Sequence, residues 1–263
     1  LLLICAAAIC GALAAAPAQA AKRQVPFGFF GTVFGSSQAN GLSDAELEAQ
    51  MARMASSGVE MVRYSIPWYA VEPEAGTYDF GWVDRLIAAA ARHRMQVLPT
   101  VVGTPRWAST RPDRDDPQLY APRDPQTYAN FVRVLIQRYG PRGSFWATSG
   151  TPKVPIRAWQ IWNEPGADFF WATQPWPRAY VRLLKPAYRA VHAADRGATV
   201  LVGGLVGVNS GTPWGQLKAI YAAGGKGYFD AIGAHYYSVA DTVKGTTAQV
   251  RELISRLRTQ SKR

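Results

Sequence analysis

Apolar and polar positions divide the chain into short apolar runs that alternate with longer amphipathic segments. The apolar runs are about seven or eight residues long and rich in aromatic and β-branched side chains, which predicts strands buried on both faces. The predicted strands are 27–34, 59–66, 95–102, 156–162, 199–206 and 230–237. The predicted helices are 44–57, 79–94, 126–139, 178–194, 214–223 and 246–258. This alternation is typical of an α/β fold with a parallel (β/α)8 barrel, the TIM barrel.

The pattern contains six βα units, and a closed barrel of this kind has eight. A barrel closes only when its last strand pairs with its first, so six units leave two strand edges exposed. No linker or low-complexity segment divides residues 21–263. We therefore expect one domain over 21–263, truncated after the sixth unit, with the remaining two units beyond Arg263.

The stretch with the clearest chemical signal is I-R-A-W-Q-I-W-N-E-P, which begins at Ile156. Its apolar run predicts a core strand, and Asn163 and Glu164 follow the run together. Pro165 removes a backbone donor and ends the strand, and it also favours an extended backbone for Glu164. In a barrel of parallel strands, catalytic groups lie at this carboxyl-terminal end.

The first twenty residues have the composition of a secretory signal peptide. An uncharged, Ala-rich run ends in Ala18-Gln19-Ala20, an A-x-A cleavage pattern. A membrane anchor of the same length is the alternative, but the cleavage pattern favours removal after Ala20 and secretion. Both cysteines, Cys5 and Cys10, fall within this segment, so the mature chain is expected to form no disulfide and no thiolate metal site.

Composition and histidine spacing argue against several other classes of protein. His93, His192 and His235 are far apart and show no zinc or iron spacing, and no glycine-rich strand–helix turn suggests a nucleotide. We expect no metal and no cofactor. The formal net charge is +11, but the basic residues are scattered and form no nucleic-acid-binding signature. Attraction to anionic cell-wall or cell-surface polymers stays open.

W-Q-I-W-N-E-P resembles the fourth-strand signature of clan A glycoside hydrolases, the group that includes families 5 and 39. The resemblance implies that Glu164 is the general acid/base and that Asn163 contacts the 2-hydroxyl of the sugar. It also implies that Arg63, in V-R-Y-S-I-P-W, supports the nucleophilic carboxylate. His235 and Tyr237, in A-H-Y-Y, resemble the H-x-Y pattern of the sixth strand, and both are expected to point toward the carboxylates.

Each of these residues has a structural alternative. Glu164 could be a solvated turn residue, Arg63 part of an ion pair inside the barrel, and His235 a buried, hydrogen-bonded histidine. Trp68 and Trp107 follow the second and third strands, where aromatic rings often stack on sugars, although a tryptophan is more often a packing residue.

The partner carboxylate is missing from this sequence. In the family it is a glutamate at the end of strand seven, and Glu252, the only glutamate after Glu164, lies in a helix-period pattern and is not assigned this role. Two hypotheses follow. The first is a secreted glycosidase that acts on oligo- or polysaccharides by the retaining mechanism that the resemblance implies. The second is a catalytically inactive carbohydrate-binding barrel.

Overall fold

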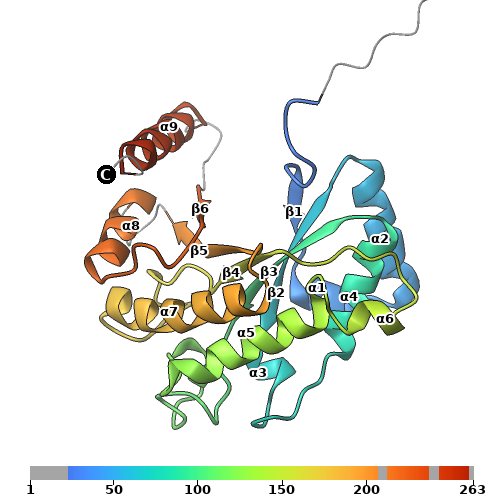
Figure 1. Cartoon of the computed structure of the whole chain (residues 1–263), viewed down its shortest axis with the longest axis horizontal. Helices are drawn as coiled ribbons and strands as arrows, with labels where there is room; N and C mark the ends of the chain where they lie inside the picture. Colours follow the sequence, from blue (N-terminus) through green and yellow to red (C-terminus); the bar gives the residue numbers. More distant parts are fainter. Residues whose placement is uncertain (1–22, 207–211, 237–242, 261–263) are drawn as a thin grey trace, which may run out of the picture.

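The computed structural model describes residues 23–206, 212–236 and 243–260. Within them, six parallel strands form one sheet in sequence order. The strands are β1 (Gly31–Val33), β2 (Met61–Pro67), β3 (Gln96–Val102), β4 (Ala158–Ile161), β5 (Thr199–Val206) and β6 (Ala231–His235). The sheet curls into a partial barrel, with the helices along its outer side (Figure 1). The predicted fold, an incomplete (β/α)8 barrel, is confirmed.

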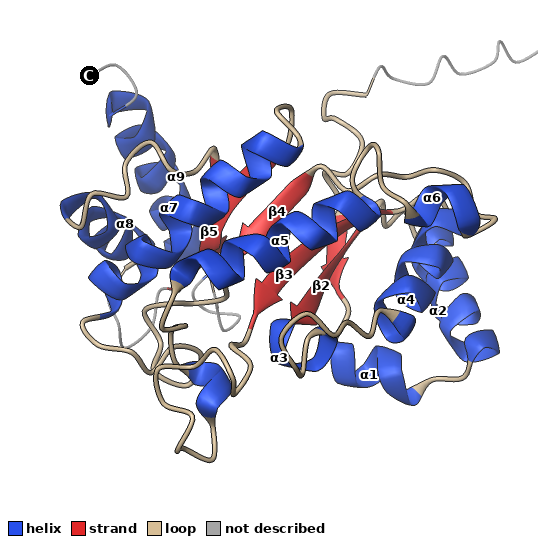
Figure 2. Cartoon of the chain, turned by 60° about the horizontal axis from the view of Figure 1, so that its bottom comes forward, coloured by secondary structure: helices blue, strands red, loops and turns tan. Residues whose placement is uncertain are grey.

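One long helix follows each strand, as the alternation predicted. These helices are α2 (Asp44–Ser56), α4 (Gly81–Arg92), α5 (Pro125–Tyr139), α7 (Trp176–Ala194), α8 (Pro213–Ala222) and α9 (Val243–Gln260). Helix α2 begins at a capping box, since the Ser43 side chain accepts from the Glu46 amide and the Ser43 amide donates to the Glu46 carboxylate. Helices α5 and α7 lie side by side (Figure 2).

Four short helical segments within the connections were not predicted. They are α1 (Ser36–Gly41), α3 (Trp68–Val71), α6 (Phe145–Thr148) and a 3-10 turn (Pro117–Leu119). Each is too short to show a helical period in the sequence. The predicted first strand, 27–34, was too long, because only Gly31–Val33 pairs with β2.

Side chains on β2 alternate between two environments. Val62, Tyr64 and Ile66 are fully buried, and they belong to the hydrophobic core between the sheet and the helices. Arg63 and Ser65 point to the other face, which is the inner face of the curled sheet, and both line a cavity there. The two-residue period of the strand therefore separates packing residues from site residues.

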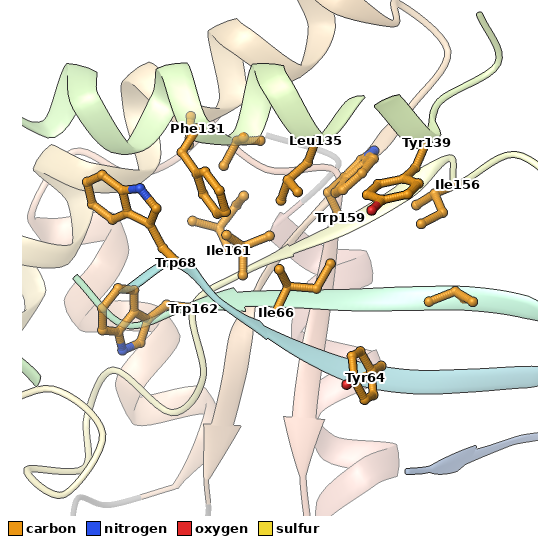
Figure 3. Packing of buried hydrophobic residues seen from close by; sticks show 14 of the residues in the cluster. Tyr64, Ile66, Trp68, Phe131, Leu135, Tyr139, Ile156, Trp159, Ile161 and Trp162 are labelled. Atoms are coloured by element: carbon orange, nitrogen blue, oxygen red, sulfur yellow. The ribbon is translucent and has the colours of Figure 1, made fainter. Parts of the chain in front are cut away.

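Aromatic side chains dominate the core beside α5 (Figure 3). Trp68 stacks on Phe131 with ring centroids 5.7 Å apart, and its other neighbours include Tyr128 at 5.7 Å in an edge-to-face arrangement. Trp162, at the end of β4, is 1% exposed and contacts Tyr128. Burial of large rings on this scale anchors α5 to the carboxyl-terminal ends of β2 and β4.

The two outer strands, β1 and β6, each have a single neighbour in the sheet. Val33 on β1 is 66% exposed, and Phe29 and Phe30 just before it are 60% and 57% exposed. Every residue of β6 is only half-buried. The expected pair of open edges is therefore present. In the part of the chain that the structure describes, no helix has the length and apolarity needed to cross a membrane.

Candidate active site

The backbone at the end of β4 turns sharply before it presents Glu164. Trp162 and Glu164 both have left-handed φ angles, 66° and 44°. The expectation that Pro165 would hold Glu164 in an extended conformation was therefore wrong. Left-handed backbone at residues other than glycine costs about 1–3 kcal/mol each and persists only where the surroundings enforce it. Such strain is concentrated at functional sites, and here it displays one carboxylate at the barrel rim.

Three contacts hold this turn. The Gln160 side-chain amide donates to the Trp162 carbonyl at 3.1 Å, and Trp162 Nε1 donates to the Phe170 carbonyl at 2.9 Å. Gly203 on β5 passes so close that a Cβ there would lie 2.4 Å from the Trp162 carbonyl oxygen. Only glycine permits this approach.

Glu164 is 3% exposed, and its Oε1 lies 2.6 Å from His235 Nδ1 at the end of β6. The contact can form in either protonation state of Glu164. A carboxylic acid donates to a neutral imidazole nitrogen, and a carboxylate accepts from a protonated one. Gly204 makes room for the ring, because a Cβ at this position would lie 2.2 Å from His235 Cε1. The two adjacent glycines of β5 thus make room for the turn before Glu164, at Gly203, and for the His235 ring, at Gly204.

Arg63 lies across the inner face of the sheet toward β4. Its guanidinium donates to Asn163 Oδ1 at 2.7 Å and to Gln160 Oε1 at 3.1 Å. Asn163 is 9% exposed, so the arginine fixes the orientation of the amide next to Glu164. Gln160 touches both this arginine and the strained turn, and sequence reasoning did not select it.

These side chains line an open cavity of about 510 Å³, a size suited to a small-molecule ligand. Its walls also include Ser65, Val102, Phe170 and Tyr236. Glu164 is the one carboxylate among the described residues that line it. Phe170, which is 36% exposed, is the phenylalanine among the described residues that line the cavity.

Trp68 does not reach the cavity. It is fully buried, with one ring face against Phe131 and Nε1 donating to Glu72 at 2.6 Å. The prediction that it stacks on a sugar was wrong (Figure 3). The alternation of side chains along β2 indicates this burial. Trp68 falls on the same face as the buried Ile66, and not on the face of Arg63. Trp107 is half-buried and donates to the Glu72 carbonyl. It is not among the described residues that line the cavity, and its role stays a prediction.

The other two histidines and Glu252 are not among the described residues that line the cavity. Tyr237 lies outside the described residues. His93 pairs with Glu48 and His192 with Asp230. Glu252 is exposed on α9 and pairs with Arg256, as its helix-period pattern suggested. No group of three or more metal-ligating side chains lies together among the described residues.

Two buried tyrosines support the rim and were not selected from the sequence. Tyr128 on α5 donates to the Val101 carbonyl at 2.7 Å, and Tyr180 on α7 donates to the Ile161 carbonyl at 2.7 Å. Tyr180 also accepts from the Gly203 amide at 2.9 Å, and burial raises the pKa of both phenols. These hydroxyls satisfy backbone groups where the strands end, which keeps the rim rigid.

Comparison with known proteins shows that the chain is similar to glycoside hydrolases. The family model that matches is glycoside hydrolase family 42, described as beta-galactosidase, over residues 39–115. A beta-galactosidase of Halorubrum lacusprofundi is 45% identical over 65 residues, 24% of this chain and 9% of the relative. The resemblance to glycoside hydrolases is confirmed. A beta-galactosidase of Haloferax lucentense is 37% identical over 122 residues, 38% of this chain and 18% of the relative.

Solved structures of glycoside hydrolases share the fold. A family 39 enzyme from Bacteroides cellulosilyticus has a TM-score of 0.57 at 19% identity, covering 78% of this chain and 37% of its own. A xylanase from Thermoanaerobacterium saccharolyticum has a TM-score of 0.58 at 18% identity, covering 85% and 69%. The sequence matches thus cover less than a fifth of the two beta-galactosidases, and the structural match covers just over a third of the family 39 enzyme. The family match includes Arg63 and ends before Glu164.

Replacing Arg63 with methionine tests whether this arginine serves the active site or only stabilises the fold. If the guanidinium orients Asn163 and supports the second carboxylate, hydrolysis by the full gene product should fall by about 100-fold or more. The melting temperature should fall only modestly, because methionine keeps the apolar volume of the arginine stem. Activity assays and thermal melts on the same preparations measure both effects.

Arg138→Met is the matched control. Arg138 is partly buried and pairs with Asp84, away from the cavity, so this variant should lose stability and keep its activity per folded molecule. Normal activity in Arg63→Met together with a melt as low as that of Arg138→Met would show that Arg63 is structural.

Proposed function

We propose that the chain forms most of the catalytic barrel of a secreted, retaining glycoside hydrolase in which Glu164 is the general acid/base. The observation that carries the proposal is the buried Glu164, which contacts His235 at 2.6 Å in a cavity shared with Arg63 and Asn163. The first twenty residues, which have the composition of a signal peptide, support secretion.

A glycosidic bond is cleaved only when its leaving oxygen is protonated and positive charge on the anomeric carbon is stabilised. In the first step, Glu164 gives its proton to the leaving oxygen as that bond breaks, and a second carboxylate forms a covalent bond to the anomeric carbon. In the second step, Glu164 takes a proton from water, the water oxygen bonds to the anomeric carbon, and the second carboxylate leaves. Glu164 ends each cycle as it began, protonated.

A neutral His235 with its proton on Nδ1 serves both steps, because Nδ1 donates to Oε1 of Glu164 whether the carboxyl group is protonated or ionised. Oε2 of Glu164 is then left to give its proton to the leaving oxygen and to take one back from water. Asn163, oriented by Arg63, is placed to bind the hydroxyl next to the anomeric carbon, a contact that strengthens in the transition state. Phe170, and not Trp68, is the aromatic side chain we propose for the apolar face of the sugar. The nucleophile is proposed to lie at the end of a seventh strand beyond Arg263, beside β6.

Beta-galactosides are the first substrates to test, since the matching family model and both curated relatives are described as beta-galactosidases. We expect the full gene product to hydrolyse an aryl β-galactoside faster than the matching xyloside or mannoside. The first-formed sugar should keep its anomeric configuration, which proton NMR of the early reaction shows directly. Inversion would rule out the retaining route, and no hydrolysis across a panel of aryl glycosides and polysaccharides would rule out the function.

A further inference from the structure

A second cavity lies at the opposite end of the sheet and is strongly basic. It has a volume of about 670 Å³ and is formed by the ends of α5 and α7 and the segments that lead into β4 and β5. Four arginines line it, Arg133, Arg142, Arg157 and Arg196, together with one carboxylate, Asp195. We name these residues the basic groove. It opens at the amino-terminal ends of the strands, whereas Glu164 and His235 lie at their carboxyl-terminal ends.

Part of the groove is held in place by contacts within the protein. Arg157 donates to Asp195 Oδ1 at 3.1 Å, and the Gly197 amide donates to the same oxygen at 3.1 Å. A Cβ on Gly197 would lie 2.2 Å from Arg157 Nη2, so a larger residue here would displace the guanidinium from this position. Oδ1 of Asp195 thus has two partners within the protein, whereas Oδ2 is buried without a hydrogen-bond partner among the described residues. The carboxylate offsets only one of the positive charges.

The other three arginines of the groove are exposed to solvent. Arg142 donates to the last carbonyl of α7, at Ala194, over 3.2 Å, which offsets the partial negative charge of that helix end. Arg133 and Arg196 are exposed, and within the described part of the chain their side chains make no ion pair or hydrogen bond. A cavity with this excess of unneutralised arginine concentrates anions.

We propose that the basic groove binds an anionic polysaccharide, through carboxylate or sulfate groups repeated along the glycan. Guanidinium groups bind both anions in paired hydrogen bonds, and several arginines around one groove suit a repeated charge better than a single ion. No aromatic side chain is among the described residues that line the groove, so it lacks the rings on which single-stranded nucleic acids stack. Bound polymer would hold the barrel on a charged matrix while the rim with Glu164 faces away from it.

The test compares two triple variants of the full gene product that lose the same charge. The groove variant removes three of the four arginines that line the groove, through Arg133→Gln, Arg142→Gln and Arg196→Gln. The control variant removes three exposed cations outside the groove, through Arg53→Gln, Arg182→Gln and Lys218→Gln. Affinity is measured for polygalacturonate and for dextran sulfate, with neutral dextran as a blank, in about 20 and 150 mM salt, over which screening of exposed charges increases strongly. The two polymers distinguish carboxylate from sulfate as the preferred anion.

The groove variant is expected to lose about tenfold or more in affinity for at least one polymer, and the control variant less than about threefold. Equal losses in both variants would overturn the proposal, because binding would then depend on net charge alone. Duplex DNA bound as tightly as either polymer, with the same dependence on the groove, would also overturn it.

A double variant, Arg133→Gln with Arg196→Gln, guards against misfolding, because it leaves the bond from Arg142 to Ala194 intact. Its loss of affinity should be intermediate between the two triple variants while its melt stays unchanged. The affinity measurement does not depend on hydrolysis. It therefore tests the groove even if the full gene product proves not to be a glycosidase.

Discussion

Glu164→Gln in the full gene product is expected to reduce hydrolysis of substrates with poor leaving groups by about 10²- to 10⁴-fold. The glutamine keeps the shape of the side chain and removes the proton that the leaving oxygen needs. Activated aryl glycosides should lose far less in the first step, since their leaving groups depart without protonation. The glycosyl-enzyme should then accumulate, because no base activates water, and added azide should restore turnover by attacking it directly.

Glu72→Gln is the matched control for this variant. Glu72 is also a buried carboxylate, at 5% exposed, but it accepts from Trp68 Nε1 and from the Gly76 amide. Its replacement should lower the melting temperature and leave the response to leaving group and azide unchanged. Wild-type rates for Glu164→Gln on an unactivated glycoside would remove Glu164 from the acid/base role.

The alternation of strands and helices could be predicted because buried parallel strands and amphipathic helices have different periods. The fifth strand was predicted with the bounds that the structure has, 199–206, since a run of β-branched residues and glycines there has no polar interruption. Strand ends were harder to predict. Pro165 suggested an extended Glu164, but the contacts of Gln160, Trp162 and Gly203 enforce a left-handed turn. The contact with Gly203 joins segments far apart in the sequence, so no local pattern predicts it.

The candidate site was predictable where a motif fixes both the residue and its place on a strand. Glu164, Asn163, Arg63 and His235 meet around one cavity. Aromatic side chains were predicted less well, because residue type alone does not say which face of the sheet a ring takes. The parity of Trp68 with Ile66 does indicate a buried ring, and the prediction of a sugar contact overlooked it. Trp68 turned toward α5, while Phe170, in a loop that has no period, reached the cavity.

Hydrolysis by two forms of the protein, residues 1–263 and the full gene product, tests the central claim most directly. In the shorter form β1 and β6 keep open edges, and exposed apolar side chains such as Phe29 and Val33 stay uncovered. Unpaired strands and apolar patches of this kind promote aggregation.

We expect residues 1–263 alone to be poorly soluble and to hydrolyse no glycoside, and the full gene product to be soluble and active. The added sequence should supply a strand that ends in the nucleophilic glutamate. Aryl glycoside hydrolysis and size-exclusion chromatography on both forms give the answer. Soluble, monomeric and active protein from residues 1–263 would contradict the claim that the nucleophile lies beyond Arg263, because the second carboxylate would then already be present in this chain.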